Sequence, residues 1–152
     1  MINENLKLSG QLNIVLKDKT GNIKAEREVK NLVVNSGLGY IASRMTGTAK
    51  SVMSHMALGS STTVAAAGQT DLVSILGSRE ALDSTTITGT NDEKVEYVAS
   101  FEAGDATGAV TEAGIFNGAT GGDMLCRTTF SVVNKAADDT MSVTWTITLS
   151  AA

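Results

Sequence analysis

The residues of this chain best suited to chemistry are its one histidine, His55, and its one cysteine, Cys126. A histidine acts as a general base only when an orienting group lies within hydrogen-bond reach, and a cysteine attacks as a thiolate that needs an activating neighbour. The sequence indicates no such partner, because His55 stands beside Met56 and Cys126 shares a strand face with Met124. We interpret both as structural, predict no catalytic residue and expect no enzymatic activity.

Two adjacent acidic pairs, Asp92-Glu93 and Asp138-Asp139, are the next candidates because carboxylates bind metals. Calcium prefers several oxygen ligands, but neither pair stands in the alternating Asp/Asn pattern of an EF-hand loop. Both pairs fall in expected turns, where carboxylates accept local backbone hydrogen bonds. A single cysteine and a single histidine also do not complete a zinc site. We therefore interpret the pairs as turn residues and expect no metal.

Two glycine-rich stretches, 104–108 and 118–122, superficially resemble phosphate-binding loops. A phosphate cradle runs into a helix that carries Lys-Ser or Lys-Thr at its start, and neither stretch does so. We interpret these glycines as loop residues with positive φ and expect no cofactor.

Composition restricts the partners. The chain has 152 residues, a formal net charge of -4 and a pI near 4.9, which argues against nucleic acid because phosphate binding depends on Lys and Arg. No apolar run approaches the ~20 residues of a membrane span, and no signal-peptide pattern is visible, so we expect no membrane partner and no export. Low charge with many Thr and Ala residues is typical of a surface that other subunits cover.

The stretch that organises the chain is 141–149, where apolar side chains alternate with serine and threonine. Successive side chains of a strand point to opposite faces, so this segment predicts a strand with one apolar and one hydroxyl-bearing face. The apolar face, which includes Trp145, must cover a core. The hydroxyl face can meet water or a neighbouring chain.

Similar alternation predicts further strands. The segment 6–16 reads as a strand with a bulge or bend at Gly10, and a hairpin loop joins it to a second strand at 23–29. Shorter strands are expected at 53–59, 80–88, 94–101, 110–116 and 124–130.

One short helix is expected at 36–45, where apolar side chains recur at helical spacing. Asn35 or Ser36 can cap it, and Leu38 and Met45 belong to the apolar face that should pack against a sheet. A single helical turn at 71–76, capped by Thr70, is also expected. Together these elements predict one all-β domain over 1–152, an antiparallel β-sandwich or jelly-roll-like fold of about eight strands with one short helix and an N-terminal arm at 1–5.

Several motifs of the chain resemble those of a family of small tailed-bacteriophage virion proteins. They are the Asn-Leu-Val-Val-Asn opening at 31–35, the Met-Ala-Leu-Gly strand at 56–59, the Thr-Glu-Ala-Gly-Ile-Phe-Asn segment at 111–117, the Val-Val-Asn-Lys-Ala loop at 132–136 and the final threonine-rich strand. Relatives in that family are described as head cement (decoration) proteins and as tail or tail-fibre proteins. The motifs concern structure and carry no active site.

The resemblance implies a structural virion protein used in many copies on a symmetric particle. Made in the host cytoplasm, it would bind the capsid exterior as a cement protein that stabilises contacts between subunits of the major capsid protein. Self-association as a dimer or a trimer is expected. The arm formed by Met1, Ile2, Asn3, Glu4 and Asn5 is the candidate partner-binding segment.

Two other readings remain open. A tail, baseplate or tail-fibre component would use the same sandwich in few copies, with loops such as 60–69 near a receptor or carbohydrate. A host-type carbohydrate-binding module is less favoured, because sugar platforms use exposed aromatic side chains and Trp145 is expected on the core face.

Overall fold

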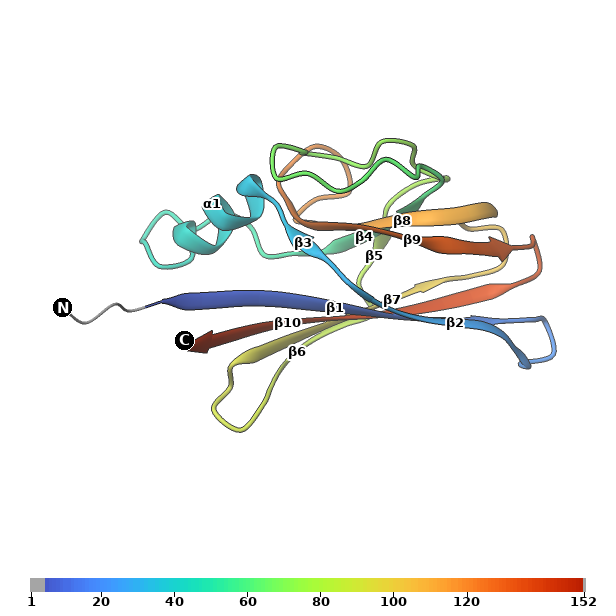
Figure 1. Ribbon diagram of the computed structural model, residues 1–152, viewed down its shortest axis with the longest axis horizontal. Helices are drawn as coiled ribbons and strands as arrows, with labels where there is room; N and C mark the ends of the chain where they lie inside the picture. Colours follow the sequence, from blue (N-terminus) through green and yellow to red (C-terminus); the bar gives the residue numbers. More distant parts are fainter. Residues whose placement is uncertain (1–4, 152) are drawn as a thin grey trace.

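Strand β10 (Thr140–Ala151) lies at the centre of a five-stranded antiparallel sheet in the computed structural model, which describes residues 5–151 (Figure 1). In this sheet, called sheet A, β10 pairs with an alternating strand on each side. The strand order is β2 (Ile23–Lys30), β1 (Leu6–Lys17), β10, β7 (Lys94–Phe101) and β6 (Ser84–Thr88). The segment expected to organise the chain therefore holds the central position of its sheet.

A second five-stranded antiparallel sheet, sheet B, covers the apolar face of sheet A, and one helix, α1 (Asn35–Ser43), lies at one end (Figure 1). The strand order of sheet B is β3 (Leu32–Val33), β9 (Met124–Lys135), β8 (Gly108–Phe116), β4 (His55–Gly59) and β5 (Glu80–Ala81). The expected all-β antiparallel sandwich with one short helix is confirmed. Of the ten strands in the described residues, only β3 and β5 are as short as two residues.

Trp145 lies at the middle of the core between the sheets and is fully buried. Leu12 on β1 and Tyr97 on β7 stand directly opposite it in the strand register, and both are buried. An aromatic side chain of this size removes about 150–250 Å² from water, which corresponds to roughly 4–6 kcal/mol of transfer free energy. The predicted core face of β10 is thus confirmed at its largest residue.

Gly10 does not form the expected bulge. β1 and β10 stay in register along their whole length, with Gly10 opposite Ile147. This position requires glycine for a steric reason, because a Cβ here would overlap the side-chain amide of Asn31. That amide is held by the core: Trp145 Nε1 donates a 2.6 Å hydrogen bond to Asn31 Oδ1. A missing side chain in β1 therefore makes room for the acceptor that the buried indole needs.

Helix α1 forms close to the expected place, but its cap and its packed face differ from the prediction. Val34 occupies the N-cap position, and no side chain caps the helix. Gly37 and Tyr40 are the buried residues, whereas Leu38 is 52% and Met45 is 86% exposed. The physical reason is that α1 approaches β9 at Gly37, where an added Cβ would collide with the carbonyl oxygen of Leu125. This close backbone contact turns Leu38 outward.

The expected strand at 80–88 is divided between the two sheets. Its first part is β5, which pairs with β4 in sheet B, and its second part is β6, which pairs with β7 in sheet A. Between them the N–H of Leu82 donates to the carbonyl of Ser54 and the N–H of Asp83 donates to that of Val98. The chain therefore crosses from one layer to the other at these two residues.

A long segment, 60–79, packs over the outer side of sheet B, and a buried carboxylate holds it there. Glu112 on β8 is fully buried and accepts backbone N–H bonds from Ser61 (3.3 Å), Val73 (3.1 Å) and Ser74 (2.7 Å). The expected helical turn at 71–76 is wrong, because these N–H groups serve the carboxylate and the isolated bridge between Gly59 and Ile75 extends the backbone.

Arg127 on β9 completes this network. Its Nε and Nη2 donate to Glu112 Oε2 at 3.0 and 2.7 Å, and both side chains are fully buried. Its Nη1 donates to the carbonyl of Thr63 and to Gln69 Oε1. A buried ion pair is tolerated only when its remaining donors and acceptors are satisfied, and here the backbone and amide of segment 60–79 supply the partners. The pair therefore fixes that segment on the sandwich.

Candidate interaction surface

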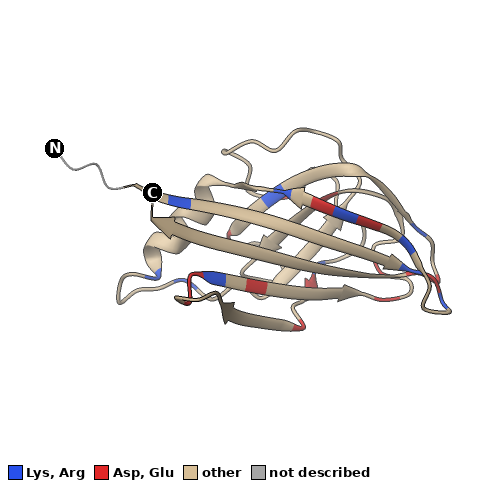
Figure 2. Ribbon diagram, turned by 60° about the horizontal axis from the view of Figure 1, so that its bottom comes forward, with Lys and Arg blue, Asp and Glu red and all other residues tan. Residues whose placement is uncertain are grey.

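The outer face of sheet A, which points away from sheet B, is mostly polar, and Val15 on β1 and Val98 on β7 are apolar residues that also lie on it. The buried side chains of β10 are its apolar ones, so its hydroxyl side chains occupy the outer face. Figure 2 shows that β10 carries no charged residue and that charged residues on β1, β2 and β7 flank it. The outward hydroxyl side chains of β10 are Thr140, Ser142, Thr144, Thr146, Thr148 and Ser150.

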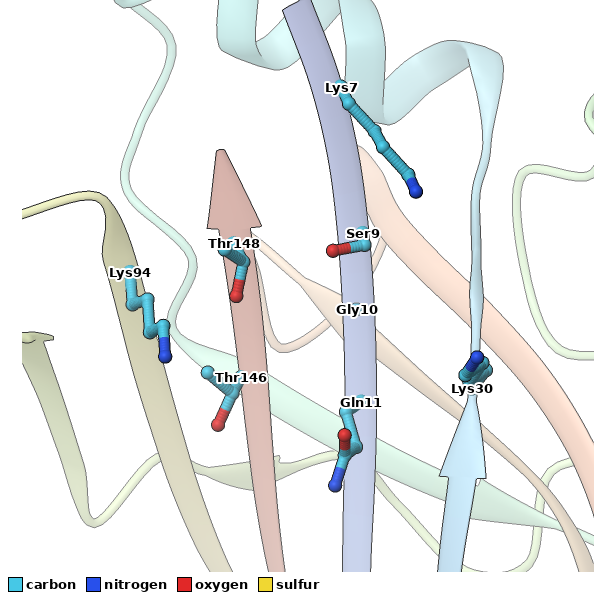
Figure 3. Close-up of a pocket in the computed structure, with 8 residues that line it drawn as sticks. All are labelled: Lys7, Ser9, Gly10, Gln11, Lys30, Lys94, Thr146 and Thr148. Atoms are coloured by element: carbon cyan, nitrogen blue, oxygen red, sulfur yellow. The ribbon is translucent and has the colours of Figure 1, made fainter. Parts of the chain in front are cut away.

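An open basin of about 520 Å³ lies on this face near the start of β1 (Figure 3). Strand register explains its composition. One row across the sheet places Lys30, Gln11 and Thr146 side by side, and the next row places Ser9, Thr148 and Lys94 side by side. Lys7 and Gly10 complete the lining.

Positive charge and hydrogen-bond donors dominate the basin. Lys7 and Lys30 are exposed and Lys94 is half-buried, while none of the lining residues is acidic. Glu96 on β7 stands directly opposite Thr146, so one carboxylate borders the basin without lining it. An anionic group ~4 Å from one ammonium gains on the order of 1–4 kcal/mol of Coulomb energy at a wet surface, before the costs of desolvation and side-chain ordering. The basin is therefore suited to binding a carboxylate, phosphate or sulfate group of a partner.

Both ends of the described chain adjoin this basin. Leu6 pairs with Ala151, and Lys7 of the basin follows immediately in β1. Asn5, the last residue of the expected arm, is exposed and directly precedes the strand. The other four arm residues, 1–4, lie outside the described residues. A partner that contacts Asn5 is thus positioned to contact Lys7 of the basin as well.

The two residues first considered for chemistry lie elsewhere. His55 begins β4 on sheet B, and its Nδ1 is 2.8 Å from the hydroxyl of Ser54. Cys126 is fully buried in the core, where burial raises the pKa of its thiol, with a smaller opposing effect from the Asn31 side chain. A buried thiol of high pKa behaves as a small apolar side chain. The structure does not bring these two residues to the basin.

One member of each acidic pair accepts a backbone hydrogen bond in a turn, as predicted. Glu93 accepts the N–H of Asn91 at 2.8 Å, and this bond lowers the pKa of Glu93. Asp139 accepts Lys24 Nζ at 2.6 Å and the N–H of Ala136 at 2.8 Å, which together lower its pKa. These carboxylates stabilise loops between strands.

The glycine-rich stretches agree with their interpretation at four positions. Gly104 and Gly108 in the first stretch and Gly121 and Gly122 in the second have positive φ, whereas Gly118 is not among the positive-φ residues.

The three lysines of the basin were not recognised in the sequence. Lys30 belongs to a strand face that reads simply as charged, and Lys7 and Lys94 are 87 positions apart. Only the pairing of both β1 and β7 with β10 brings them together. The available signal was the hydroxyl face of β10, which indicated a surface able to meet a neighbouring chain.

Within residues 5–151, no group of three or more His, Cys, Asp and Glu side chains is arranged to hold a metal ion. The described part of the chain also has no helix of the length and apolarity that crossing a bilayer requires. Comparison of the chain with protein-family models, with curated proteins and with solved structures finds no match.

Proposed function

We propose that this chain is a structural virion protein, a capsid cement protein that binds the outside of a phage head and stabilises contacts between major capsid protein subunits. The observation that carries the proposal is the mostly polar outer face of sheet A, with a lysine-lined basin beside the start of β1. The motif resemblance to virion proteins supplies the setting. The basin supplies a binding surface that needs no catalytic group.

The contact would be electrostatic at its centre. Lys7, Lys30 and Lys94 provide ammonium groups, and Thr146 and Thr148 provide hydroxyls that can donate or accept. The chain as a whole carries a net charge of -4, so the basin is a local reversal of charge. An acidic segment of a capsid subunit would be drawn to this basin and repelled by most of the remaining surface.

Repetition would make such a modest contact effective. A single shallow contact of this kind binds weakly, because exposed ion pairs contribute only about 0–1 kcal/mol each. On a shell, one copy that bridges two capsid subunits makes two contacts, and the second is intramolecular. Anything that binds the assembled shell in preference to free subunits stabilises it by mass action. The arm at 1–5 would extend the contact onto a neighbour.

The test uses two charge reversals with the same chemistry. Lys7→Glu together with Lys30→Glu should abolish co-sedimentation of the purified protein with phage heads assembled without it. Lys17→Glu together with Lys19→Glu is the matched control, because these two exposed lysines lie at the opposite end of β1, at the β1–β2 hairpin loop, and their reversal changes the net charge by the same amount. Equal binding by both variants, with unchanged Trp145 fluorescence as the check of folding, would refute the basin as the contact.

A tail, baseplate or tail-fibre component is the second candidate, and the anchoring of segment 60–79 favours it. A binding loop gains affinity when it is ordered beforehand, and the buried pair Glu112–Arg127 orders this segment. Substitutions at exposed Thr62 or Val64 would then reduce receptor binding while the basin variants bind normally.

A further inference from the structure

The sandwich has four sheet edges, and three of them are protected against pairing. Sheet B ends in β3 and β5, each only two residues long. The β2 edge of sheet A carries Lys24, Glu26, Glu28 and Lys30 at alternate positions. Short strands and charged side chains are the usual means by which a protein prevents edge-to-edge association. The fourth edge, β6, has neither feature.

Strand β6 is five residues long and reads Ser-Thr-Thr-Ile-Thr, without a charge. Four of its residues are exposed, and the apolar Ile87 among them is 64% exposed. In the described part of the chain, β6 forms hydrogen bonds with β7 alone. Every second residue of an antiparallel edge strand directs its N–H and C=O outward. β6 is therefore an open template for another strand.

We propose that β6 pairs with β6 of a second copy of this chain, antiparallel about a two-fold axis at Thr86. The register that this symmetry imposes is self-complementary. Thr86 stands opposite Thr86 of the second copy, and Ser84 stands opposite Thr88, so hydroxyl side chains face one another on the outer side. On the inner side, each Ile87 lies beside Thr85 of the other copy.

The uncharged sequence of β6 favours this arrangement, because no like charges face each other along the strand itself. At each end of the paired strands, Asp83 of one copy stands opposite Gly89 of the other, and the Glu93 carboxylate lies beside that glycine. Lys94, which pairs with Thr88, lies in the adjoining row and partly offsets these carboxylates. The ends of β6 therefore weaken the association, and its middle carries it.

Exposed apolar surface also favours a second copy. Ile87 is opposite Val95 on β7, and Val95 is opposite Ile147 on β10, so Ile87 is the outermost member of an apolar row on the inner face of sheet A. Pairing would place the two Ile87 side chains in one cluster and shield both from water. Stable dimers bury about 1,200–2,000 Å² of surface. Pairing along a five-residue edge buries less than that, so we expect weak association in solution. This inference does not depend on the proposed function.

Disulfide trapping tests the register directly. In Thr86→Cys, the new cysteines of the two copies stand opposite each other, with Cα atoms about 4.5–5.5 Å apart, a distance that a disulfide spans. In the matched control Ser84→Cys, the two cysteines are four residues out of register, about 13 Å apart. The native Cys126 is buried and gives no background. We expect Thr86→Cys to form covalent dimers at least about tenfold faster than Ser84→Cys.

Two further measurements test the pairing in case a cysteine at position 86 disturbs β6. The double variant Ser84→Cys/Thr88→Cys should form covalent dimers readily, because the symmetry places residue 84 opposite residue 88. In sedimentation equilibrium, the average mass of the wild-type chain should rise with concentration, and Thr86→Lys should keep the protein monomeric. Equal trapping rates at positions 86 and 84, or a concentration-dependent trimer that Thr86→Lys leaves unchanged, would overturn the proposal. Failure of all trapping would mean that β6 does not pair with a second copy.

Discussion

Replacing Glu112 by glutamine should destabilise the protein strongly, although the two side chains have almost the same size. The carboxylate accepts five hydrogen bonds, three from the backbone of Ser61, Val73 and Ser74 and two from Arg127. An amide offers one acceptor oxygen and turns an NH₂ group toward the remaining donors. The substitution therefore leaves a buried guanidinium without its counter-charge and at least one N–H without an acceptor.

The size of this loss of stability follows from the burial of Glu112 and Arg127. Both side chains of the pair have 0% exposed surface, so water cannot replace the lost partner. Removing one member of such a pair costs about 3–5 kcal/mol, of which an unsatisfied buried donor alone accounts for about 1–3 kcal/mol. Domains of this kind have total stabilities of about 5–15 kcal/mol. Glu112→Gln should thus remove a large fraction of the stability, and Arg127→Met should do the same.

Urea unfolding followed by the fluorescence of the single tryptophan measures these costs. The double variant Glu112→Gln/Arg127→Met should lose less stability than the sum of the single variants, because it leaves no unpaired charge. Amide hydrogen exchange of Val73 and Ser74 should accelerate in Glu112→Gln, since their acceptor is lost. A cost below about 1 kcal/mol, or strictly additive single variants, would refute the reasoning that this pair anchors segment 60–79.

Three further perturbations test other parts of the account. Gly10→Ala should displace the acceptor of the Trp145 indole N–H, cost about 1–3 kcal/mol in urea unfolding and shift the tryptophan emission; wild-type stability with unchanged emission would contradict this. The pKa of Asp18 is lowered from 3.8 to about 2, chiefly by the Thr20 hydroxyl. The stability that the ionised Asp18 contributes should therefore be complete above pH 3.8 and disappear as the pH falls to about 2. Asp18→Asn should be less stable than the wild type at neutral pH and equally stable in strong acid. A stability difference that stays constant across that pH range would exclude the assignment. Cys126 should resist a water-soluble thiol reagent in the folded protein and react fully in denaturant, whereas rapid native-state labelling would show that its site opens.

Strand positions were predictable because period-two alternation is a strong local signal. β10, β1 and β7 each alternate over eight residues or more, and each lies where its pattern indicates. The helix was also visible, but its packed face was not. Spacing placed Leu38 and Met45 on the packed face, whereas Tyr40 is buried, because the close approach of backbone at Gly37 decides which side faces the sheet.

The remaining features could not be predicted, because they depend on contacts between residues that are far apart in the sequence. Glu112 and Arg127 read as ordinary polar positions of two strands, and nothing local indicates that the loop between β4 and β5 will supply their hydrogen bonds. The basin depends on the same kind of information, because its lysines come from three strands that only the sheet register aligns. The sequence therefore predicts the layers well and the interaction surface only through the hydroxyl face of β10.

The most direct test of the proposed function is the copy number of this chain relative to the major capsid protein in purified phage particles that contain the chain. Quantitative mass spectrometry of both proteins in the same particles gives the ratio. The account predicts one copy per capsid subunit or a simple fraction of that number, as a contact repeated over the shell requires. A handful of copies per particle would contradict a capsid cement protein and place the chain in the tail.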